Sequence, residues 1–244
     1  MRKITVGLVA DLGPKDPILP GVAAVVLSAV LATAGCASQK RVALWNGKDF
    51  SGWKLFVPDS RRPHLTGRSV DVHSVWSVKD GVIHCRGRPN CYMRTQADYS
   101  DYKLHLEWRW VEQPTNSGVL LHASGPDKVW PRCIESQLKS GNAGDFVLIG
   151  GTGISVGGRF IQDVSEQYVI VPKKQESSEK APGQWNTYDI ICRGDTILNY
   201  VNGELQNKGT SATETSGRIC LQSEGSPIEF RNIYIESLGP RSLD

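Results

Sequence analysis

The sequence lacks a strong excess of either charge. Its 244 residues include 28 Lys and Arg against 25 Asp and Glu, which leaves a formal net charge of +3. Proteins that bind nucleic acid usually present a basic surface to the phosphates, so no nucleic-acid partner is expected. With 39% hydrophobic and 22% charged residues, the composition is that of a globular protein with a sizeable core.

Long helical patterns and internal repeats are also missing. No extended segment shows the 3.6-residue apolar period of an amphipathic helix, which argues against a helical fold. No sequence unit recurs at a fixed spacing, and this disfavours a propeller. Short apolar runs are instead separated by turn pairs such as Asp80-Gly81 and Asn202-Gly203. This arrangement predicts an all-β fold, an antiparallel sandwich or jelly roll.

Cysteine is sparse. The chain has six cysteines, and none has the paired spacing of a structural zinc site. Cys85 and Cys91 flank residues 86–90, a loop short enough for a disulfide at the end of a hairpin. If Cys36 carries lipid, five cysteines remain, and an odd number cannot all pair.

One long apolar run, from Ile18 to Cys36, lies near the N-terminus. It ends in small residues, as the hydrophobic region of a secretory signal peptide does. The ending Thr33-Ala34-Gly35-Cys36 resembles a bacterial lipobox, and that resemblance implies cleavage before Cys36 and lipidation of its thiol. A transmembrane anchor is the alternative, because the run approaches the ~20 residues that a span needs, although Pro20 and Gly21 shorten it.

These features predict how the chain is divided. We expect a signal peptide with lipobox over residues 1–36, a tether over 37–41, one folded domain over 42–239 and a tail over 240–244. The expected location is outside the cytoplasm. The protein would be held by its lipid to a membrane of the bacterial cell envelope, in the periplasm or on the cell surface.

The clearest strand signal is the period-two alternation from Tyr102 to Trp110. One face carries Leu104, Leu106, Trp108 and Trp110, and the other carries Lys103, His105, Glu107 and Arg109. Side chains alternate between the two faces of a strand. One face is therefore expected to pack in the core and the other to be polar.

A second alternating stretch, Cys133 to Leu138, carries the polar groups of most interest. Ile134 and Leu138 share one face, whereas Glu135 and Gln137 share the other. A polar face of this kind is explained equally well by simple solvation of an antiparallel sheet. The interpretation as a binding surface is favoured because neighbouring segments have the same alternation.

Six distinctive blocks of sequence follow one another along the chain. They are LWNGKDFSGW, HLEWRW, NSGVLLH, WPRCIESQL followed by GDF, GQWNTYDI with VNGELQNKG, and LQSEGSPIEFRNIYIESL. Together, from about Leu44 to Leu238, they resemble the bacterial 3-keto-disaccharide hydrolase domain family, formerly a domain of unknown function. The resemblance implies a concanavalin A-like jelly roll of two curved antiparallel sheets, with a carbohydrate groove on the concave face. One departure is Glu224, where many members carry a histidine.

Residues expected on the groove face are the site candidates. The candidate catalytic residues are Glu135, Glu107, His122 and Arg109. The candidate substrate-binding residues are Arg132, Gln137, Asn116, Trp130, His105, Gln222 and Glu224. Carboxylates, amides and guanidinium groups hydrogen-bond sugar hydroxyls, and tryptophan stacks on sugar rings. A histidine such as His122 is more often a structural residue than a catalyst.

The first functional hypothesis is an enzyme that acts on glycosides already oxidised at C3. The ketone acidifies the C2 proton, so a base removes it, the enolate expels the C1 substituent and water then adds. Glu135 is the candidate base. Arg109 or Arg132 would stabilise the enolate, unless a bound divalent metal takes that role. Glu107 or His122 would protonate the leaving group.

Two other functions stay open. One is a non-catalytic carbohydrate-binding module on the cell surface, which would use the same face for affinity alone. The other is a hydrolase of unmodified glycosides, which needs two carboxylates about 5–10 Å apart. Glu107 and Glu135 are the obvious pair for that reaction. Glu107 and Arg109 could equally form a cross-strand ion pair with no role in a reaction.

Overall fold

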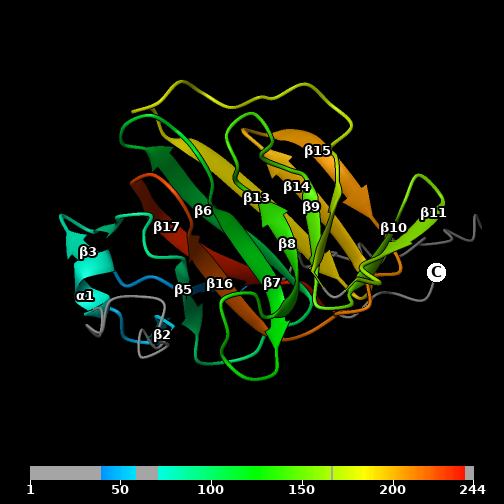
Figure 1. Cartoon of the computed structure of the whole chain (residues 1–244), viewed down its shortest axis with the longest axis horizontal. Helices are drawn as coiled ribbons and strands as arrows, with labels where there is room; N and C mark the ends of the chain where they lie inside the picture. Colours follow the sequence, from blue (N-terminus) through cyan, green and yellow to red (C-terminus); the bar gives the residue numbers. More distant parts are fainter. Residues whose placement is uncertain (1–39, 59–70, 166, 240–244) are drawn as a thin grey trace, which may run out of the picture. The chain divides into compact units, whose positions relative to one another are not determined.

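The alternating segments form strands that pair into two antiparallel sheets (Figure 1). The computed structural model describes residues 40–58, 71–165 and 167–239. The predicted signal peptide with its lipobox and Cys36, most of the tether and the tail lie outside the described residues. Within those described ranges, no helix is long and apolar enough to span a membrane.

The eight-stranded sheet has the order β15-β14-β13-β6-β17-β4-β3, and β1 pairs with β17. Its strands are β1 (Arg41–Ala43), β3 (Trp76–Lys79), β4 (Val82–Cys85), β6 (Tyr102–Trp110), β13 (Asn186–Arg193), β14 (Thr196–Val201), β15 (Glu204–Gly209) and β17 (Ile228–Ser237). The tight turns predicted from the sequence join β3 to β4 and β14 to β15. Asn202 and Gly203 adopt φ values of 51° and 84°, which suit a two-residue hairpin turn.

The seven-stranded sheet has the order β12-β9-β8-β7-β16-β5-β2. Its strands are β2 (Trp53–Phe56), β5 (Cys91–Thr95), β7 (Gly118–Ser124), β8 (Arg132–Gln137), β9 (Phe146–Ile149), β12 (Tyr168–Val171) and β16 (Arg218–Ser223). A separate hairpin pairs β10 (Gly153–Val156) with β11 (Arg159–Gln162), and α1 (Val72–Val75) is a single turn. The predicted all-β jelly-roll sandwich is confirmed.

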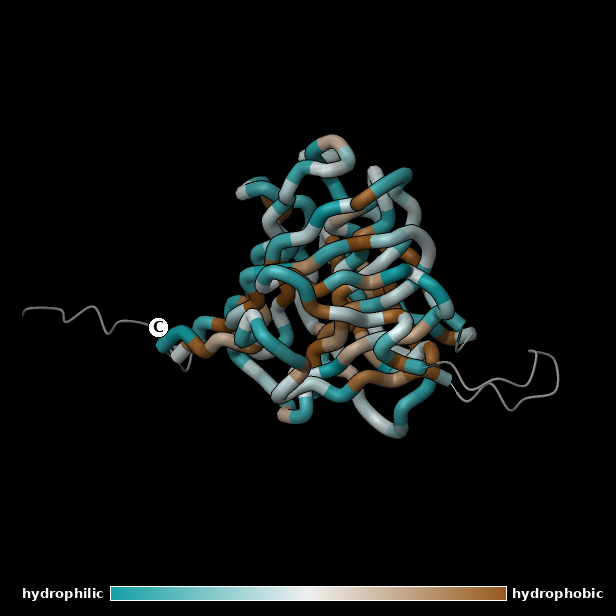
Figure 2. The backbone as a smooth tube through the Cα atoms, turned by 90° about the vertical axis from the view of Figure 1, so that its left-hand side faces the viewer, coloured by the Kyte–Doolittle hydropathy of each residue, from teal (hydrophilic) through white to brown (hydrophobic). Residues whose placement is uncertain are grey.

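The core lies between the two sheets, where each contributes one face. On β6, Leu104, Leu106 and Trp108 are fully buried, as the alternation predicts. They belong to one apolar cluster with Ile134 of β8 and Leu148 of β9. In Figure 2 the hydrophobic stretches gather inside the trace, and hydrophilic stretches follow the outer loops. Hydrophobic burial on one face of each strand therefore holds the sandwich together.

A buried polar link also joins the two sheets. The Asn199 side chain of β14 accepts a hydrogen bond from the Ser136 hydroxyl of β8 at 2.8 Å and donates to the Gly144 carbonyl at 3.1 Å. Asn199 and Ser136 are both fully buried. Because an unpaired buried amide costs free energy, this link fixes β8 against the opposite sheet.

The disulfide that the short loop between Cys85 and Cys91 would allow does not form. Both cysteines are free and buried. Residues 86–90 do not close a hairpin, since Cys85 ends β4 in one sheet and Cys91 begins β5 in the other. Burial raises the pKa of the Cys85 thiol to about 12, so the thiol is protonated at neutral pH.

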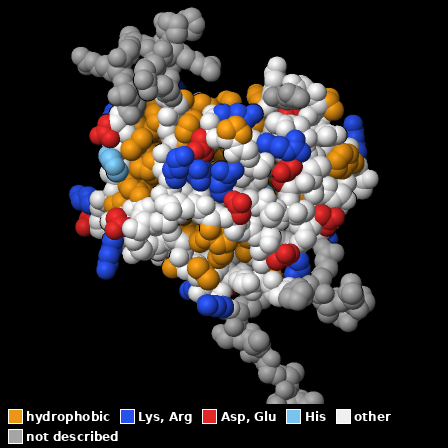
Figure 3. Space-filling model, turned by 90° about the horizontal axis from the view of Figure 1, so that it is seen from below, with side chains coloured by type: hydrophobic (Ala, Val, Ile, Leu, Met, Phe, Trp, Pro, Cys, Tyr) orange, Lys and Arg blue, Asp and Glu red, His pale blue; other side chains and the backbone are white. Residues whose placement is uncertain are grey.

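Charged side chains of both signs are interspersed on the face seen in Figure 3, with apolar patches between them. This pattern matches the nearly balanced composition of the chain.

Candidate functional site

The side of the seven-stranded sheet that faces away from the core forms a groove floor. On β8, Ile134 and Ser136 point into the sandwich, so Cys133, Glu135 and Gln137 point to the other side. That side is also dry. Cys133 packs in a second apolar cluster with Leu120, Val147, Ile149, Tyr92 and Cys220.

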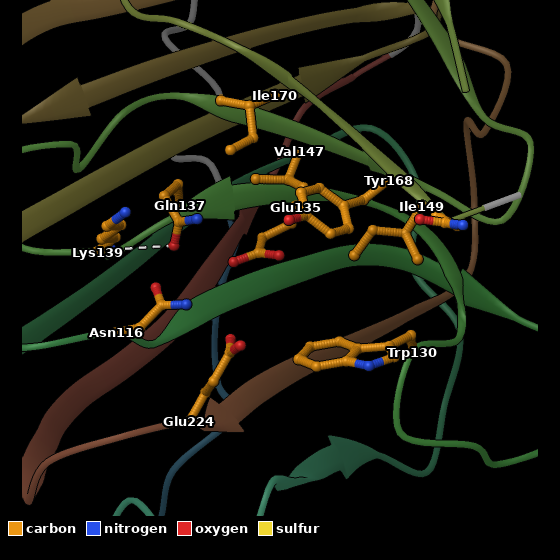
Figure 4. A pocket seen from close by; sticks show the side chains of 11 residues that line it. Asn116, Trp130, Glu135, Gln137, Lys139, Val147, Ile149, Tyr168, Ile170 and Glu224 are labelled. Carbon is orange, nitrogen blue, oxygen red and sulfur yellow. Dashed lines mark hydrogen bonds between the residues drawn. The ribbon is translucent and has the colours of Figure 1, made fainter. Parts of the chain in front are cut away.

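A pocket of about 230 Å³ opens over this floor (Figure 4). Its lining residues are Asn116, Trp130, Glu135, Gln137, Lys139, Val147, Ile149, Gln167, Tyr168, Ile170 and Glu224. A second cavity of about 350 Å³ shares Trp130, Ile149, Gln167 and Tyr168 with it. The two cavities therefore continue one another along the sheet, and together they suit a ligand larger than one small ring.

Glu135 is the most deeply buried carboxylate of the pocket. Its side chain is 3% exposed, and its Oε1 atom has no hydrogen-bond partner among the described residues. Burial, and to a lesser extent the charge of Glu224, raises the pKa of Glu135 well above its ordinary value. Such surroundings favour the neutral carboxylic acid over the carboxylate.

Gly118 of β7 makes room for that carboxyl group. A Cβ atom at Gly118 would lie 1.9 Å from the Glu135 Oε1 atom. Glycine is therefore required here by the close approach of a side chain, and not by its own backbone angles.

Glu224 faces Glu135 across the pocket (Figure 4). It follows directly after β16. Burial raises the pKa of Glu224 to about 7, although a hydrogen bond from Asn116 and the charges of Arg88 and Lys139 oppose the rise. Two carboxyl groups in one pocket with unequal pKa values form a typical acid and base pair.

Amide side chains surround the two carboxyl groups. The Gln137 Oε1 atom accepts hydrogen bonds from the backbone N–H groups of Leu138 at 3.0 Å and Lys139 at 2.9 Å. Its NH₂ group is left to donate to a ligand. Gln222 is 1% exposed, and neither of its side-chain polar atoms has a partner in the described part of the chain. Because Leu221 pairs with Val119, Gln222 comes next in the ladder, beside Gly118.

Three predicted residues are not in this pocket. His105, Glu107 and Arg109 lie on β6, in the eight-stranded sheet, on the face opposite to its buried side chains. The expectation that they share a groove with Glu135 is wrong, because the sandwich core separates the two faces. The proposed pairing of Glu107 with Glu135 is wrong for the same reason.

Contacts on the outer face of the eight-stranded sheet account for these three side chains. Arg231 donates to Glu107 at 2.7 Å, and Arg109 binds Glu229 and lies over the Trp185 ring. Partial burial opposes ionisation of Glu107, but hydrogen bonds from Asn232 and Arg231 outweigh it and lower the pKa. His105 binds Asp189 at 2.9 Å and stacks on Tyr234.

His122 and Arg132 are also directed elsewhere. His122 has a φ of 54° at an irregularity between β7 and β8, which reverses the alternation. Its ring consequently lies against Tyr102 of the core, 5.6 Å between centroids, and its Nδ1 atom is 2.9 Å from the Glu214 carbonyl. Arg132 donates to the Glu214 carboxylate and to the Gly150 carbonyl. Arg132, a candidate substrate-binding residue, therefore does not line the pocket.

Of the predicted residues, Glu135, Gln137, Asn116, Trp130 and Glu224 line one pocket. Sequence reasoning missed Lys139, Val147, Ile149, Gln167, Tyr168 and Ile170, which also line it. The signal for Val147, Ile149, Tyr168 and Ile170 was the apolar runs FVLI and YVIV, each with apolar residues on both faces of a strand. Such runs indicate a sheet with two covered faces. Across the described ranges, no group of three or more His, Cys, Asp and Glu side chains could hold a metal ion.

A known protein family shares the sequence pattern of this chain. A family model described as the 3-keto-alpha-glucoside-1,2-lyase-like domain matches residues 40–236. No curated protein matches the chain.

Solved structures share the fold. A protein of Parabacteroides distasonis, provisionally described as a glycosyl hydrolase, is 24% identical with a TM-score of 0.57, over 82% of this chain and 94% of its own. The β-glucanase of Bacillus licheniformis is 14% identical with a TM-score of 0.51, over 82% and 98%. A carbohydrate-binding module of Bacillus subtilis is 10% identical with a TM-score of 0.51, over 76% and 96%. At these identities the likeness shows the fold alone.

Gly118→Ala is expected to displace the Glu135 carboxyl group, because the new methyl group would occupy its position. Chemical denaturation of the single and double variants with Glu135→Ala should give a coupling free energy of about 0.5–3 kcal/mol. Gly239→Ala, where a Cβ meets nothing within 4 Å, is the matched control. If the losses of unfolding free energy in the two single variants simply add in the double variant, the contact between Gly118 and Glu135 is contradicted.

Stability is expected to fall as the pH rises. In the unfolded chain both glutamates titrate near ~4.3, whereas in the folded protein the pKa of Glu224 is about 7 and that of Glu135 is raised further above its ordinary value. Between these pKa values unfolding releases protons, so higher pH favours the unfolded state. The Tm of the parent should therefore drop between pH 5 and 8 by at least about 2–4 °C more than that of Glu135→Gln/Glu224→Gln, which is the shift that ~1 kcal/mol produces in a chain of this size. If the Tm of the parent and that of the double variant change with pH in the same way, neither carboxyl group has a raised pKa.

Proposed function

Since the chain belongs to the 3-keto-alpha-glucoside-1,2-lyase-like domain family, we propose that it cleaves glycosides already oxidised at C3. The family and the sandwich fold support a carbohydrate-related hydrolase or binding function. The observation that carries the finer proposal is a pair of facing carboxyl groups with raised but unequal pKa values, the buried Glu135 and the half-buried Glu224. Elimination from a 3-keto-glycoside needs one base and one acid in one site.

Glu224 is assigned as the base. With a pKa of about 7 it is substantially ionised at neutral pH and still basic enough to take the acidified C2 proton. An ordinary histidine titrates near ~6.5. Glu224 therefore supplies a base of similar strength at the position where many family members carry a histidine.

Glu135 is assigned as the acid, which revises the role expected from the sequence. Because its pKa lies well above the ordinary value, Glu135 holds a proton that it can give to the leaving group. The C1–O bond breaks, its electron pair stays on the leaving oxygen, and that oxygen takes the Glu135 proton. The sugar is left with a C1=C2 double bond conjugated to the C3 ketone, and water then adds across it.

The enolate oxygen needs a donor or a positive charge while the C2 proton leaves. The Gln137 NH₂ group and the Lys139 ammonium group are the candidates that line the pocket. They replace Arg109 and Arg132, which are engaged in ion pairs elsewhere. A divalent cation bound with the substrate is an alternative source of charge.

Replacement of Glu224 tests the assignment. Glu224→Gln should lower kcat on a 3-keto-glucoside by about 10²–10⁴, because it removes the base and keeps the shape. Glu224→His should recover part of this loss, and the rate of the parent should rise with pH through about 7, where Glu224 ionises. Glu112→Gln, on an exposed loop, is the control.

Substrate choice separates the alternatives. Cleavage of 3-keto-glucosides but not of the unoxidised parents supports the proposal, and chelator treatment reports on a metal. Cleavage of the unoxidised parents would instead support a conventional two-carboxylate hydrolase. Binding without turnover would support a carbohydrate-binding module.

We also propose that the protein is exported and held to a membrane through lipid on Cys36, on the evidence of the apolar run that ends there. Cys36→Ser should move the protein from the membrane fraction to the soluble fraction. Retention in the membrane fraction would identify the run as a transmembrane anchor.

A further inference from the structure

The walls of the pocket differ in chemistry from one side to the other. A polar wall is formed by Asn116, Glu135, Gln137, Lys139 and Glu224, and an apolar wall by Trp130, Val147, Ile149, Tyr168 and Ile170. Figure 4 shows Asn116, Gln137, Lys139 and Glu224 towards one side and Trp130, Tyr168 and Ile149 towards the other. Gln167, the residue before Tyr168, also lines the pocket. The polar wall belongs to the proposed chemistry, whereas the apolar wall has no role in it so far.

The apolar wall begins directly beside the reacting carboxyl groups. In the sheet, Val147 pairs with Glu135 and Ile149 pairs with Cys133. The edge strand β12 extends the wall, since Tyr168 pairs with Ile149 and Ile170 with Val147. A group leaving from C1 of a sugar held at Glu135 therefore meets an aliphatic surface at once.

Several side chains of this wall are exposed although they are large and apolar. Trp130 is 37%, Tyr168 61% and Ile170 47% exposed. The second cavity is lined by Trp130, Ile149 and Tyr168, together with Lys128, Gly150 and Gln167. Exposed apolar groups that converge on a cavity next to a candidate active site are typical of a ligand-binding surface.

Resting on the proposed function, we infer that the preferred C1 substituent is an apolar ring, aromatic or alicyclic, bound between Trp130 and Tyr168. A second sugar in this place would turn hydroxyl groups towards Val147 and Ile149, which offer no hydrogen bond, and buried unpaired hydroxyls are costly. The polar side chains that line the second cavity, Lys128 and Gln167, are exposed to solvent and can keep their water contacts. An apolar ring instead loses water-exposed surface on both sides.

A matched substrate pair tests the inference without a difference in leaving-group acidity. Two 3-keto-glucosides, one with a cyclohexylmethyl group and one with a 6-linked glucosyl group at C1, both release a primary alcohol. The full-length protein should show a kcat/KM at least about tenfold higher for the cyclohexylmethyl substrate. The same preference should appear when the unoxidised parents are titrated onto Glu224→Gln by calorimetry.

Variants of the apolar wall then locate the preference. Trp130→Ala and Ile170→Ser should bring the ratio of the two kcat/KM values towards one, mainly through KM of the apolar substrate. Phe160→Ala removes a ring of similar exposure, 50%, outside the pocket and should leave the ratio unchanged.

The outcomes distinguish this inference from the proposed function. Equal kcat/KM values for the two substrates, or a higher value for the glucosyl substrate, would overturn the apolar subsite. The proposed elimination reaction would be unaffected. A preference that survives both wall substitutions would also overturn it. No turnover of either substrate would remove the proposed function, and the inference with it.

Discussion

The site depends on one constraint, which is that β8 is covered on both faces. Ile134 and Ser136 face the sandwich core, whereas Cys133 and Glu135 face a second apolar cluster under the pocket. A carboxyl group placed in such a strand cannot keep its water shell, and it stays in the fold mainly as the neutral acid. Gly118 gives the group its space, and the buried link between Ser136 and Asn199 fixes the strand that carries it.

The loss of water around Glu135 also connects the polar wall of the pocket with its apolar wall. Val147 and Ile149 exclude water beside Glu135 and so help to raise its pKa, while Glu224, farther towards the rim, is desolvated less. This difference in burial separates the pKa values of two chemically identical side chains. An apolar leaving group bound against Val147 and Ile149 would displace more water and increase the difference. Substrate selection and acid-base chemistry would then share one physical cause.

The opposite outer face of the sandwich shows why polar alternation alone misleads. Glu107 and Arg109 have the same pattern as Glu135 and Gln137, yet Arg231 and Glu229 bind them as ion pairs and the Trp185 ring lies against Arg109. Ion pairs of this kind keep both partners charged, and despite partial burial the contacts of Glu107 with Asn232 and Arg231 lower its pKa. Glu135 and Glu224 differ because burial raises their pKa values, and for Glu224 it outweighs the opposing charges of Arg88 and Lys139.

The sequence by itself determined the fold class, most strand positions, the face of β8 that carries Glu135, and the family. Those properties depend on local period and on ordered motifs, which a linear pattern records. The tertiary structure alone decided which sheet each strand joins, so it placed β6 away from β8 and brought Glu224 and Tyr168 to Glu135. It also decided that the His122 side chain points into the core, because the backbone irregularity at His122 reverses the alternation of the strand. Sheet order and burial arise from contacts between residues far apart in the chain, and they set the pKa values that local sequence does not encode.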